Sequence, residues 1–332
     1  MPGTKGVAFR ERVNARKWEQ RANNVWSKLY GLTTTPNNIV ALSTLSLIEG
    51  NPKGPGACNY CCPFCISHAN DTNERRIEGF PTPIEKIEFY SKIFNKVAFG
   101  LPHGMATGIG ETTLAEPERL KQVFALWHDM GIISELQTNG SLLTHENLTL
   151  WHNNNKGLNT VAISCVSHFD QVNANILSKG RVPYNLAKTV GEARDIGLLV
   201  RLCVTMLRGD HGEGVNSPDS LLAFLKFAKE VGAEQVTFRE MGKPRMIVED
   251  RAKKVADWID RHYVNPSFVI NVLEGVGATK EASLPWSVRY FYNGLSVVLA
   301  ECLTPPIDGK VRSAVIRGNG LYDGWDRPMR IA

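Results

Sequence analysis

Long hydrophobic runs are missing from this sequence, and none approaches the roughly 20 apolar residues that a transmembrane helix needs. Residues 1–20 also lack the apolar core of a secretory signal, and no low-complexity segment interrupts the chain. We therefore expect a cytoplasmic protein with no membrane partner. The chain has 332 residues, of which 43% are hydrophobic and 21% charged, so it can bury a core of ordinary size.

Cysteine is also scarce, and its distribution argues against a disulfide framework. The seven cysteines are few for a chain of this length, and their number is odd. Four of them fall within the octapeptide CNYCCPFC, at Cys58, Cys61, Cys62 and Cys65. In a reducing compartment such a cluster more often binds metal than forms disulfides. The sequence therefore indicates a metal site on this loop.

From residue 38 onward, short β-rich runs alternate with helical patterns. We expect strands at 38–48, 102–108, 131–140, 158–167, 198–207 and 234–240, with helices at 83–94, 117–130, 145–153, 184–196 and 218–231 between them. Such alternation predicts a parallel sheet with right-handed crossovers, closed into a partial (β/α)6 TIM-like barrel. Active sites of these barrels lie at the carboxyl ends of the strands. The polar residues that follow each strand are therefore the candidates for function.

The alternation divides the chain into three parts. Residues 38–245 form the expected α/β barrel, and residues 246–332 form a small α+β C-terminal region. In that region we expect a helix at 249–262, a strand at 267–273, and β-like stretches at 288–300 and 311–317. Residues 1–37 form a basic extension, because residues 1–30 hold seven Lys/Arg against two Glu. An amphipathic helix packed on the main body is the favoured interpretation, and a site for nucleic acid or another acidic partner is the alternative.

Two spacings run through the four loop cysteines. Cys58–Cys61 with Cys62–Cys65 gives two C-x2-C pairs of the kind that hold tetrahedral zinc. Successive residues of an extended chain point in opposite directions, however, so Cys61 and Cys62 would hardly reach one ion. Cys58, Cys62 and Cys65 give the spacing C-x3-C-x2-C instead. A [4Fe–4S] cube normally takes four cysteines, so three thiolates leave one iron open to a small molecule.

The C-x3-C-x2-C loop after the first expected strand, with Phe64 before the last cysteine, resembles the signature of the radical S-adenosylmethionine (radical SAM) superfamily. TGIGETTL (107–114) is similar to the superfamily's Gly-Gly-Glu-Pro stretch, and QTNGSLL (137–143) to its Thr-Asn-Gly turn. AISCVSHFD (162–170) and ARDIGLLVRLCVTML (193–207) resemble members related to the molybdenum-cofactor cyclase. The resemblance covers roughly residues 38–240.

The resemblance implies two cofactors and a set of residues to hold them. A [4Fe–4S] cluster on Cys58, Cys62 and Cys65 would bind S-adenosylmethionine and split it reductively, so that the product radical abstracts a hydrogen from a substrate. The other residues that the resemblance singles out would bind S-adenosylmethionine. Phe64 would lie beside the adenine, and Gly108, Gly110 and Glu111 would bind the ammonium. Ser164 is a candidate for the carboxylate or ribose, and Asn139 is a weaker one. Thr112 departs from the superfamily, which usually has proline there.

The other cysteines receive different interpretations. We expect Cys61 to point away from the cluster, and Cys165 and Cys203 to be buried in strands as small core residues. Relatives of the molybdenum-cofactor cyclase bind auxiliary clusters through several C-terminal cysteines, whereas this chain has only Cys302 there. The sequence therefore predicts a single cluster.

Two arginines on expected strands have open roles. Arg201 and Arg239 would need a partner if they faced the barrel interior. Each could bind the carboxylate of a cofactor or substrate, or could form an ordinary ion pair at a strand end.

The sequence leaves the substrate open. The basic N-terminus favours an anionic small molecule, such as a nucleotide or a phosphorylated metabolite, or a nucleic acid, and a flavodoxin or ferredoxin would supply the electron. A glycyl-radical-type activase and a peptide-modifying enzyme are alternatives within the superfamily, because the fold does not choose among them. A zinc-stabilised nucleic-acid-binding protein is the alternative of another class.

Overall fold

The computed structural model describes residues 43–52, 57–65, 77–98, 102–243, 250–284, 287–300, 313–323 and 330–332. The expected alternation is confirmed within these ranges. The strands are β1 (Ser43–Ile48), β2 (Pro102–Thr107), β3 (Ile133–Thr138), β4 (Thr160–Cys165), β5 (Leu199–Thr205) and β6 (Gln235–Arg239). The helices between them are α3 (Ile84–Val97), α4 (Pro117–Asp129), α5 (His145–His152), α6 (Asp170–Ser178), α7 (Leu186–Ile196) and α8 (Pro218–Val231). The basic extension 1–37 lies outside the described residues.

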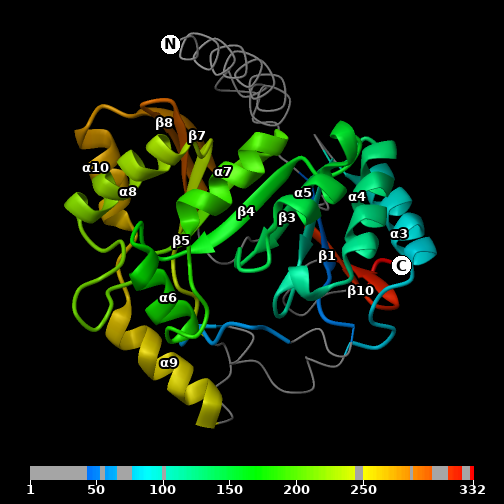
Figure 1. Cartoon of the computed structure of the whole chain (residues 1–332), viewed down its shortest axis with the longest axis horizontal. Helices are drawn as coiled ribbons and strands as arrows, with labels where there is room; N and C mark the ends of the chain where they lie inside the picture. Colours follow the sequence, from blue (N-terminus) through cyan, green and yellow to red (C-terminus); the bar gives the residue numbers. More distant parts are fainter. Residues whose placement is uncertain are drawn as a thin grey trace, which may run out of the picture.

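The described strands form one 11-stranded sheet in the order β11-β10-β1-β2-β3-β4-β5-β6-β9-β8-β7 (Figure 1). Every neighbouring pair from β10 through β1–β6 to β9 is parallel, and only the outer pairs β10–β11, β8–β9 and β7–β8 are antiparallel. The central parallel α/β sheet is thus as expected, but the sheet is open, and closure toward a barrel is not confirmed by the strand pairing.

The C-terminal strands extend this same sheet at both of its sides. β9 (Leu295–Ala300) pairs with β6, and β10 (Ser313–Arg317) pairs with β1. β7 (Thr279–Leu284), β8 (Ser287–Tyr292) and β11 (Gly320–Tyr322) complete the edges. The β-like stretches expected at 288–300 and 311–317 therefore exist. The first of them is a hairpin, because Asn293 and Gly294 form its turn with φ of 50° and 87°, the left-handed region that these residues tolerate best.

One predicted element is of the wrong type, and helix α6 was not among the predicted helices. Residues 267–273 were expected to form a strand, but they lie in helix α10 (Ser267–Gly275), which follows α9 (Asp250–His262). The run SFVINVL is rich in β-branched residues, and a short apolar run does not distinguish a buried strand from a helix. The buried residues Val269 and Leu273 are four positions apart, so they share the face of α10 that enters the core.

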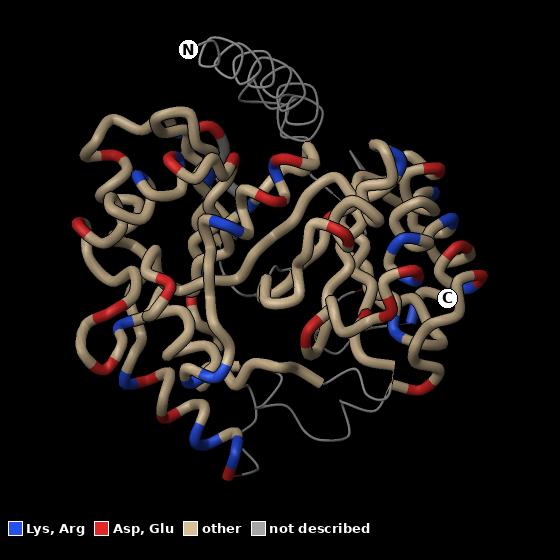
Figure 2. The backbone as a smooth tube through the Cα atoms, in the orientation of Figure 1, with Lys and Arg blue, Asp and Glu red and all other residues tan. Residues whose placement is uncertain are grey.

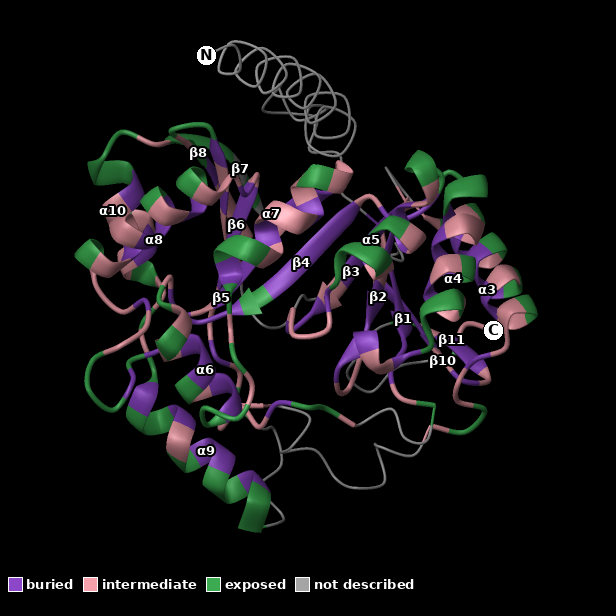
Figure 3. Ribbon diagram, viewed as in Figure 1, coloured by how far each residue is buried: buried purple, intermediate pink, exposed green. Residues whose placement is uncertain are grey.

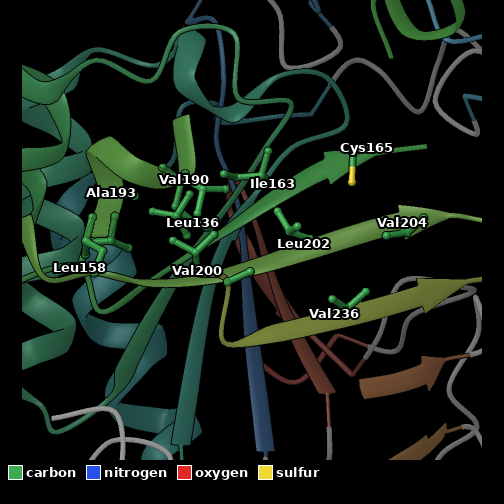
Figure 4. Packing of buried hydrophobic residues seen from close by; sticks show 14 of the residues in the cluster. Leu136, Leu158, Ile163, Cys165, Val190, Ala193, Val200, Leu202, Val204 and Val236 are labelled. Carbon is green, nitrogen blue, oxygen red and sulfur yellow. The ribbon is translucent and has the colours of Figure 1, made fainter. Parts of the chain in front are cut away.

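Apolar side chains cover one face of the sheet and hold the helices against it. Consecutive helices contact one another in the series α3–α4–α5–α7–α8–α10, so they form one layer. Alternate strand residues point into this layer, including Leu136, Ile163, Val200, Leu202 and Val236, as Figure 4 shows. Figure 3 shows the same pattern as purple strands beneath helices whose outer surfaces are green. This layer is the main hydrophobic core.

The opposite face of the sheet carries polar side chains. On β2, β3, β5 and β6 the residues that alternate with the core positions include His103, Glu135, Gln137, Arg201, Gln235, Thr237 and Arg239. No helix of the series above packs on this face, so its polar groups must be satisfied by one another, by water or by a ligand. A functional site is expected on this face.

Charged residues of both signs lie along the peripheral helices, most visibly on α9 (Figure 2). Among the residues that the structure describes, no helix has the length and apolarity needed to cross a membrane.

The helix layer gives the first prediction. Trp127 on α4 is fully buried, and its Nε1 donates to Ser91 Oγ at 3.1 Å. Replacing Trp127 by alanine is expected to lower the free energy of unfolding by about 3–5 kcal/mol, because a large cavity opens between α4 and the sheet. Urea denaturation followed by circular dichroism measures the loss. Phe89→Ala on the neighbouring helix is the control, since this side chain is 56% exposed and should cost less than about 1 kcal/mol.

Candidate functional site

The cysteine loop lies across the carboxyl ends of the strands. At its start, Glu111 N, after β2, donates to Ala57 O at 2.9 Å. In its middle, Cys61 N donates to Leu177 O at 2.9 Å, at the end of the helix that follows β4. Just before Cys61, Tyr60 is buried in a small cluster with Leu207 and Met241, which follow β5 and β6. The chain after β1 therefore contacts the polar end of nearly every strand of the expected barrel.

The thiols of the three-cysteine pattern lie within electrostatic reach of one another. The pKa of Cys62 is raised well above its usual range, first by burial, then by Cys65 and Cys58, and least by Cys61, its sequence neighbour. The pKa of Cys58 is raised to about 11 by partial loss of solvent around its sulfur, and Glu111 and Cys65 add to the shift. Cys58 and Cys62 each therefore have Cys65 as an electrostatic neighbour.

These thiols are not gathered as ligands of a single ion. In the described part of the chain, no group of three or more His, Cys, Asp or Glu side chains is placed to hold one metal ion. A cube of four irons binds each thiolate at a different corner, so it requires wider spacing than a single ion does. The donor set otherwise suits a cluster, because cysteine sulfur is the ligand that iron–sulfur clusters take and a nearby metal cation favours the thiolate form.

Two amide donors already point at the sulfur of Cys58. Tyr60 N donates to Cys58 Sγ at 3.4 Å, and Asn139 Nδ2 lies 3.9 Å from the same atom. Hydrogen bonds to sulfur are among the features by which proteins tune iron–sulfur clusters. Asn139 also donates to Asn59 Oδ1 at 2.8 Å and accepts from Ser141 Oγ at 2.6 Å. The turn after β3 therefore holds the first half of the cysteine loop in place.

Glu111 is buried between the ends of β2 and β3, where four donors reach its carboxylate. Oε1 accepts from Thr113 N at 3.0 Å, from Thr113 Oγ1 at 2.6 Å and from Thr138 Oγ1 at 2.5 Å, and Oε2 accepts from Asn139 N at 2.7 Å. Among the residues that the structure describes, Asn139 N alone donates to Oε2, so this oxygen retains capacity for another donor. Thr112, where the resemblance leads one to expect proline, begins the short helix η3 (Thr112–Leu114) and is buried.

A close approach of the backbone explains Gly108. A Cβ atom at this position would lie 2.8 Å from Glu49 O, at the end of β1. Only glycine allows the ends of β1 and β2 to come so near to each other. Gly110 follows in the same partly buried turn and leads into Glu111.

Ser164 and Phe64 are separated in this arrangement. Ser164 is exposed although it lies on the central strand β4, so its side chain reaches solvent from the polar face. Phe64 instead packs against Trp258 of α9, with ring centroids 5.7 Å apart. The structure therefore brings Glu111 and Asn139 close to Cys58, and it places Phe64 with α9.

Several residues of the site were not found from the sequence. The ring of Tyr184 lies 6.4 Å from that of Tyr60, and its hydroxyl donates to Ser164 O. Trp258 lies between Phe64 and His262, whose ring centroid is 4.0 Å from its own. These contacts join segments far apart in the sequence, so no local pattern indicates them.

A buried ion pair lies on the polar face below the loop. Arg201 on β5 pairs with Glu135 on β3, and His103 Nε2 on β2 lies 3.6 Å from the second carboxylate oxygen. Burial raises the pKa of Glu135, but Arg201 and then His103 outweigh it and lower the pKa to about 2. Of the two roles left open for Arg201, the structure shows the ion pair. Arg239 has no such partner among the described residues.

Comparison of the sequence with protein-family models and with curated proteins gives no match. Solved structures of similar fold do exist. SuiB of Streptococcus suis matches with a TM-score of 0.51 and 12% identity over 92% of this chain and 64% of SuiB. The chain thus spans slightly less than two thirds of the length of SuiB. This match shows a shared fold.

Two further solved structures have lower scores. anSMEcpe with bound AdoMet and a Kp18Cys peptide matches with a TM-score of 0.45 and 14% identity, over 71% of this chain and 59% of that one. TsrM from Kitasatospora setae, a radical S-adenosylmethionine methyltransferase, matches with a TM-score of 0.37 and 12% identity, over 64% and 37% of the two chains.

The ion pair gives a prediction with a defined pH window. Because the pKa of Glu135 is lowered from 4.5 to about 2, its contribution to stability is present above pH 4.5 and is lost as the pH falls toward 2. The shift corresponds to about 3 kcal/mol. Glu135→Gln should therefore be less stable than wild type at pH 7 and should show a flatter decline between pH 4.5 and 2, measured by urea unfolding at each pH.

The control is the double variant Glu135→Leu with Arg201→Met, which removes both charges and should regain most of the lost stability. A decline in Glu135→Gln as steep as that of wild type would show that Glu135 does not carry this pH dependence.

Proposed function

We propose that this protein is a radical S-adenosylmethionine enzyme whose [4Fe–4S] cluster is held by Cys58, Cys62 and Cys65. The observation that carries the proposal is the position of Cys58 beside Asn139 and Glu111 at the carboxyl ends of the strands, on the same short loop as Cys62 and Cys65. The similarity in fold to SuiB supports it, and SuiB has been crystallised with S-adenosylmethionine. Fold alone would not assign the chemistry.

In this proposal the cofactors supply the chemistry, and residues of the chain bind and position them. When bound, the reduced cluster supplies the electron that splits the S–C5′ bond of S-adenosylmethionine, which yields a radical able to abstract a hydrogen. Glu111 Oε2, with its remaining capacity, would accept the ammonium of the methionine group. Gly108 and Gly110 keep this turn narrow, and exposed Ser164 and nearby Asn139 would contact the carboxylate or ribose. Phe64 would contact the adenine together with Trp258.

The organisation of the chain follows from the same proposal. Residues 38–245 would be the catalytic unit, curved into a partial (β/α)6 barrel with its polar face inside, and residues 246–332 would cover its mouth. The helix series on a single face of β1–β6 is the arrangement that such a barrel requires. Residues 1–37 would be a basic helical extension, and a flavodoxin or ferredoxin would deliver the electron in the cytoplasm.

SuiB has also been crystallised with its precursor peptide SuiA. A peptide is therefore a second candidate substrate for this protein, beside a small anionic molecule. The relationship to molybdenum-cofactor-cyclase-like members and the predicted single cluster remain proposals, since Cys302 lies outside the described residues.

The ligand set is tested by iron content. Cys62→Ala should lose the cluster, whereas Cys61→Ala should keep about four iron atoms per chain after anaerobic reconstitution. Cys61 and Cys62 are adjacent on one loop, so general disruption of the loop by an alanine substitution should affect both variants equally. Iron and sulfide analysis with visible absorbance gives the answer. Loss in Cys61→Ala with retention in Cys62→Ala would show the pairing to be wrong.

The reaction is tested by its first product. Anaerobic protein reconstituted with iron and sulfide, reduced with dithionite and given S-adenosylmethionine should form 5′-deoxyadenosine, detected by mass spectrometry. Cys58→Ala, Cys62→Ala and Cys65→Ala should each abolish the product, because none retains three ligands. Cys61→Ala should retain it. A colourless protein that binds zinc and forms no 5′-deoxyadenosine would remove the proposal.

A further inference from the structure

The last residue of β6, Arg239, has no ion-pair partner among the described residues. Arg239 is partly buried, and its Nε atom is enclosed by protein yet makes no hydrogen bond to any residue that the structure describes. No carboxylate or aromatic ring in the described ranges pairs with its side chain. A guanidinium withdrawn from water without an anion is costly, so such an arrangement indicates a missing ligand.

Arg201 provides the internal comparison. It lies on the neighbouring strand β5, in register with Gln235, and its side chain points to the same polar face as Arg239. Arg201 is paired with Glu135. Arg239 lies four residues beyond Gln235 on β6, so its side chain is too far along the strand to join the Arg201–Glu135 pair. The lack of a partner is therefore a property of this position and not of arginines on this face.

A second unsatisfied group faces the same region. Thr237 lies two residues before Arg239 and thus on the same face, and it is only 4% exposed. Its hydroxyl makes no hydrogen bond in the described structure. Buried hydroxyls are nearly always paired, so an unpaired one beside an unpaired guanidinium points to the same ligand.

A row of side chains across three strands joins Thr237 to an exposed residue. Thr237 is in register with Cys203, and Cys203 with Ser164. This row runs from buried Thr237 through buried Cys203 to exposed Ser164. Two residues after Arg239, Met241 packs in the cluster that contains Tyr60 and borders Cys62. The region is therefore adjacent to the cysteine loop.

The chemistry of the two groups defines the ligand. A guanidinium presents a planar fork that matches a carboxylate with two parallel hydrogen bonds, and the threonine hydroxyl adds a third. The side chains of Met206 and Met241 at these strand ends are buried and apolar, so one positive charge there is matched best by one negative charge. A monoanion of planar shape fits this requirement better than a phosphate.

We propose that Arg239 and Thr237 form a carboxylate-binding subsite at the carboxyl end of β6. The carboxylate belongs either to the substrate or to the amino-acid part of S-adenosylmethionine. The subsite deepens the proposed function and rests on it for its role beside a radical, but carboxylate binding itself requires no cluster.

The test is arginine-selective labelling of the full chain with phenylglyoxal, followed by peptide mass spectrometry. Arg239 should react faster than Arg201, because only Arg201 is held in an ion pair. Acetate at about ten times its dissociation constant should slow labelling of Arg239 roughly tenfold, since only free sites react. Labelling of Arg201 should not change, and chloride at equal ionic strength should have no effect.

The source of the carboxylate is resolved in the reconstituted protein. Protection by S-adenosylmethionine, but not by its decarboxylated analogue, assigns the subsite to the cofactor. Protection by acetate without protection by S-adenosylmethionine assigns it to the substrate. The acetate measurement is repeated without iron, so a failure of the cluster proposal does not affect it.

Three outcomes would overturn the subsite: no labelling of Arg239, labelling that acetate does not slow, or stronger protection by inorganic phosphate than by acetate. Stability gives an independent measurement. Arg239→Met should not lower the melting temperature of the ligand-free protein, because it removes an unpaired cation, whereas Arg201→Met should lower it. Equal losses in the two variants would mean that Arg239 has a protein partner, and the proposal would fail.

Discussion

The packing of all the main helices against one face of the sheet determines the rest of this structure. Leu, Ile and Val alternate along β1–β6 so that their side chains enter the helix layer, and the helices contact one another in chain order. Burial of this apolar surface is the main source of stability. Because a strand places successive residues on opposite faces, the other face receives the remaining residues, and here these are largely polar. The fold thus produces a core and a polar surface from the same strands.

Polar groups on such a surface need hydrogen-bond or ion-pair partners, and these partners determine the arrangement of the site. Glu135 and Arg201 neutralise each other with His103 nearby, so the middle of the face is balanced in charge. At the strand ends, Glu111 accepts hydrogen bonds from hydroxyl and amide donors and has no cationic partner among the described residues. The cysteine loop lies over these ends and is fixed by hydrogen bonds to segments after β2, β3 and β4. Contacts within the chain therefore position the loop.

The sequence was sufficient for the six strand–helix repeats because each has a regular period and a clear stop, such as Gly197 after α7 and Gly232 after α8. It was insufficient where partners are distant. β9 and β10 join opposite sides of one sheet, and no local pattern specifies either neighbour. α10 was mistaken for a strand because its β-branched residues fit both structures.

The candidate site shows the same division. The spacing of Cys58, Cys62 and Cys65 and the Gly-x-Gly-Glu turn could be found as local motifs, and the structure places Cys58, Glu111 and Asn139 together. The sequence did not reveal which of Arg201 and Arg239 has an ion-pair partner. The partner of Arg201 is Glu135 on β3, and β3 lies two strands away from β5. Pairing across a sheet requires the register of every strand between the two residues.

The two uncompensated charges lie on different sides of the strand ends, and their separation bears on what binds there. Glu111 is held at β2 and β3, whereas Arg239 lies on β6. Neighbouring strands are about 4.8 Å apart, so β3 and β6 are separated by roughly 14 Å along the sheet. The ammonium and carboxylate of one α-amino acid are joined through a single carbon. One such ligand could bind both Glu111 and Arg239 only if these two side chains extended toward each other. Two ligands, one at each charge and both adjoining the cysteine loop, fit the spacing more simply. In that arrangement the carboxylate at Arg239 belongs to the substrate.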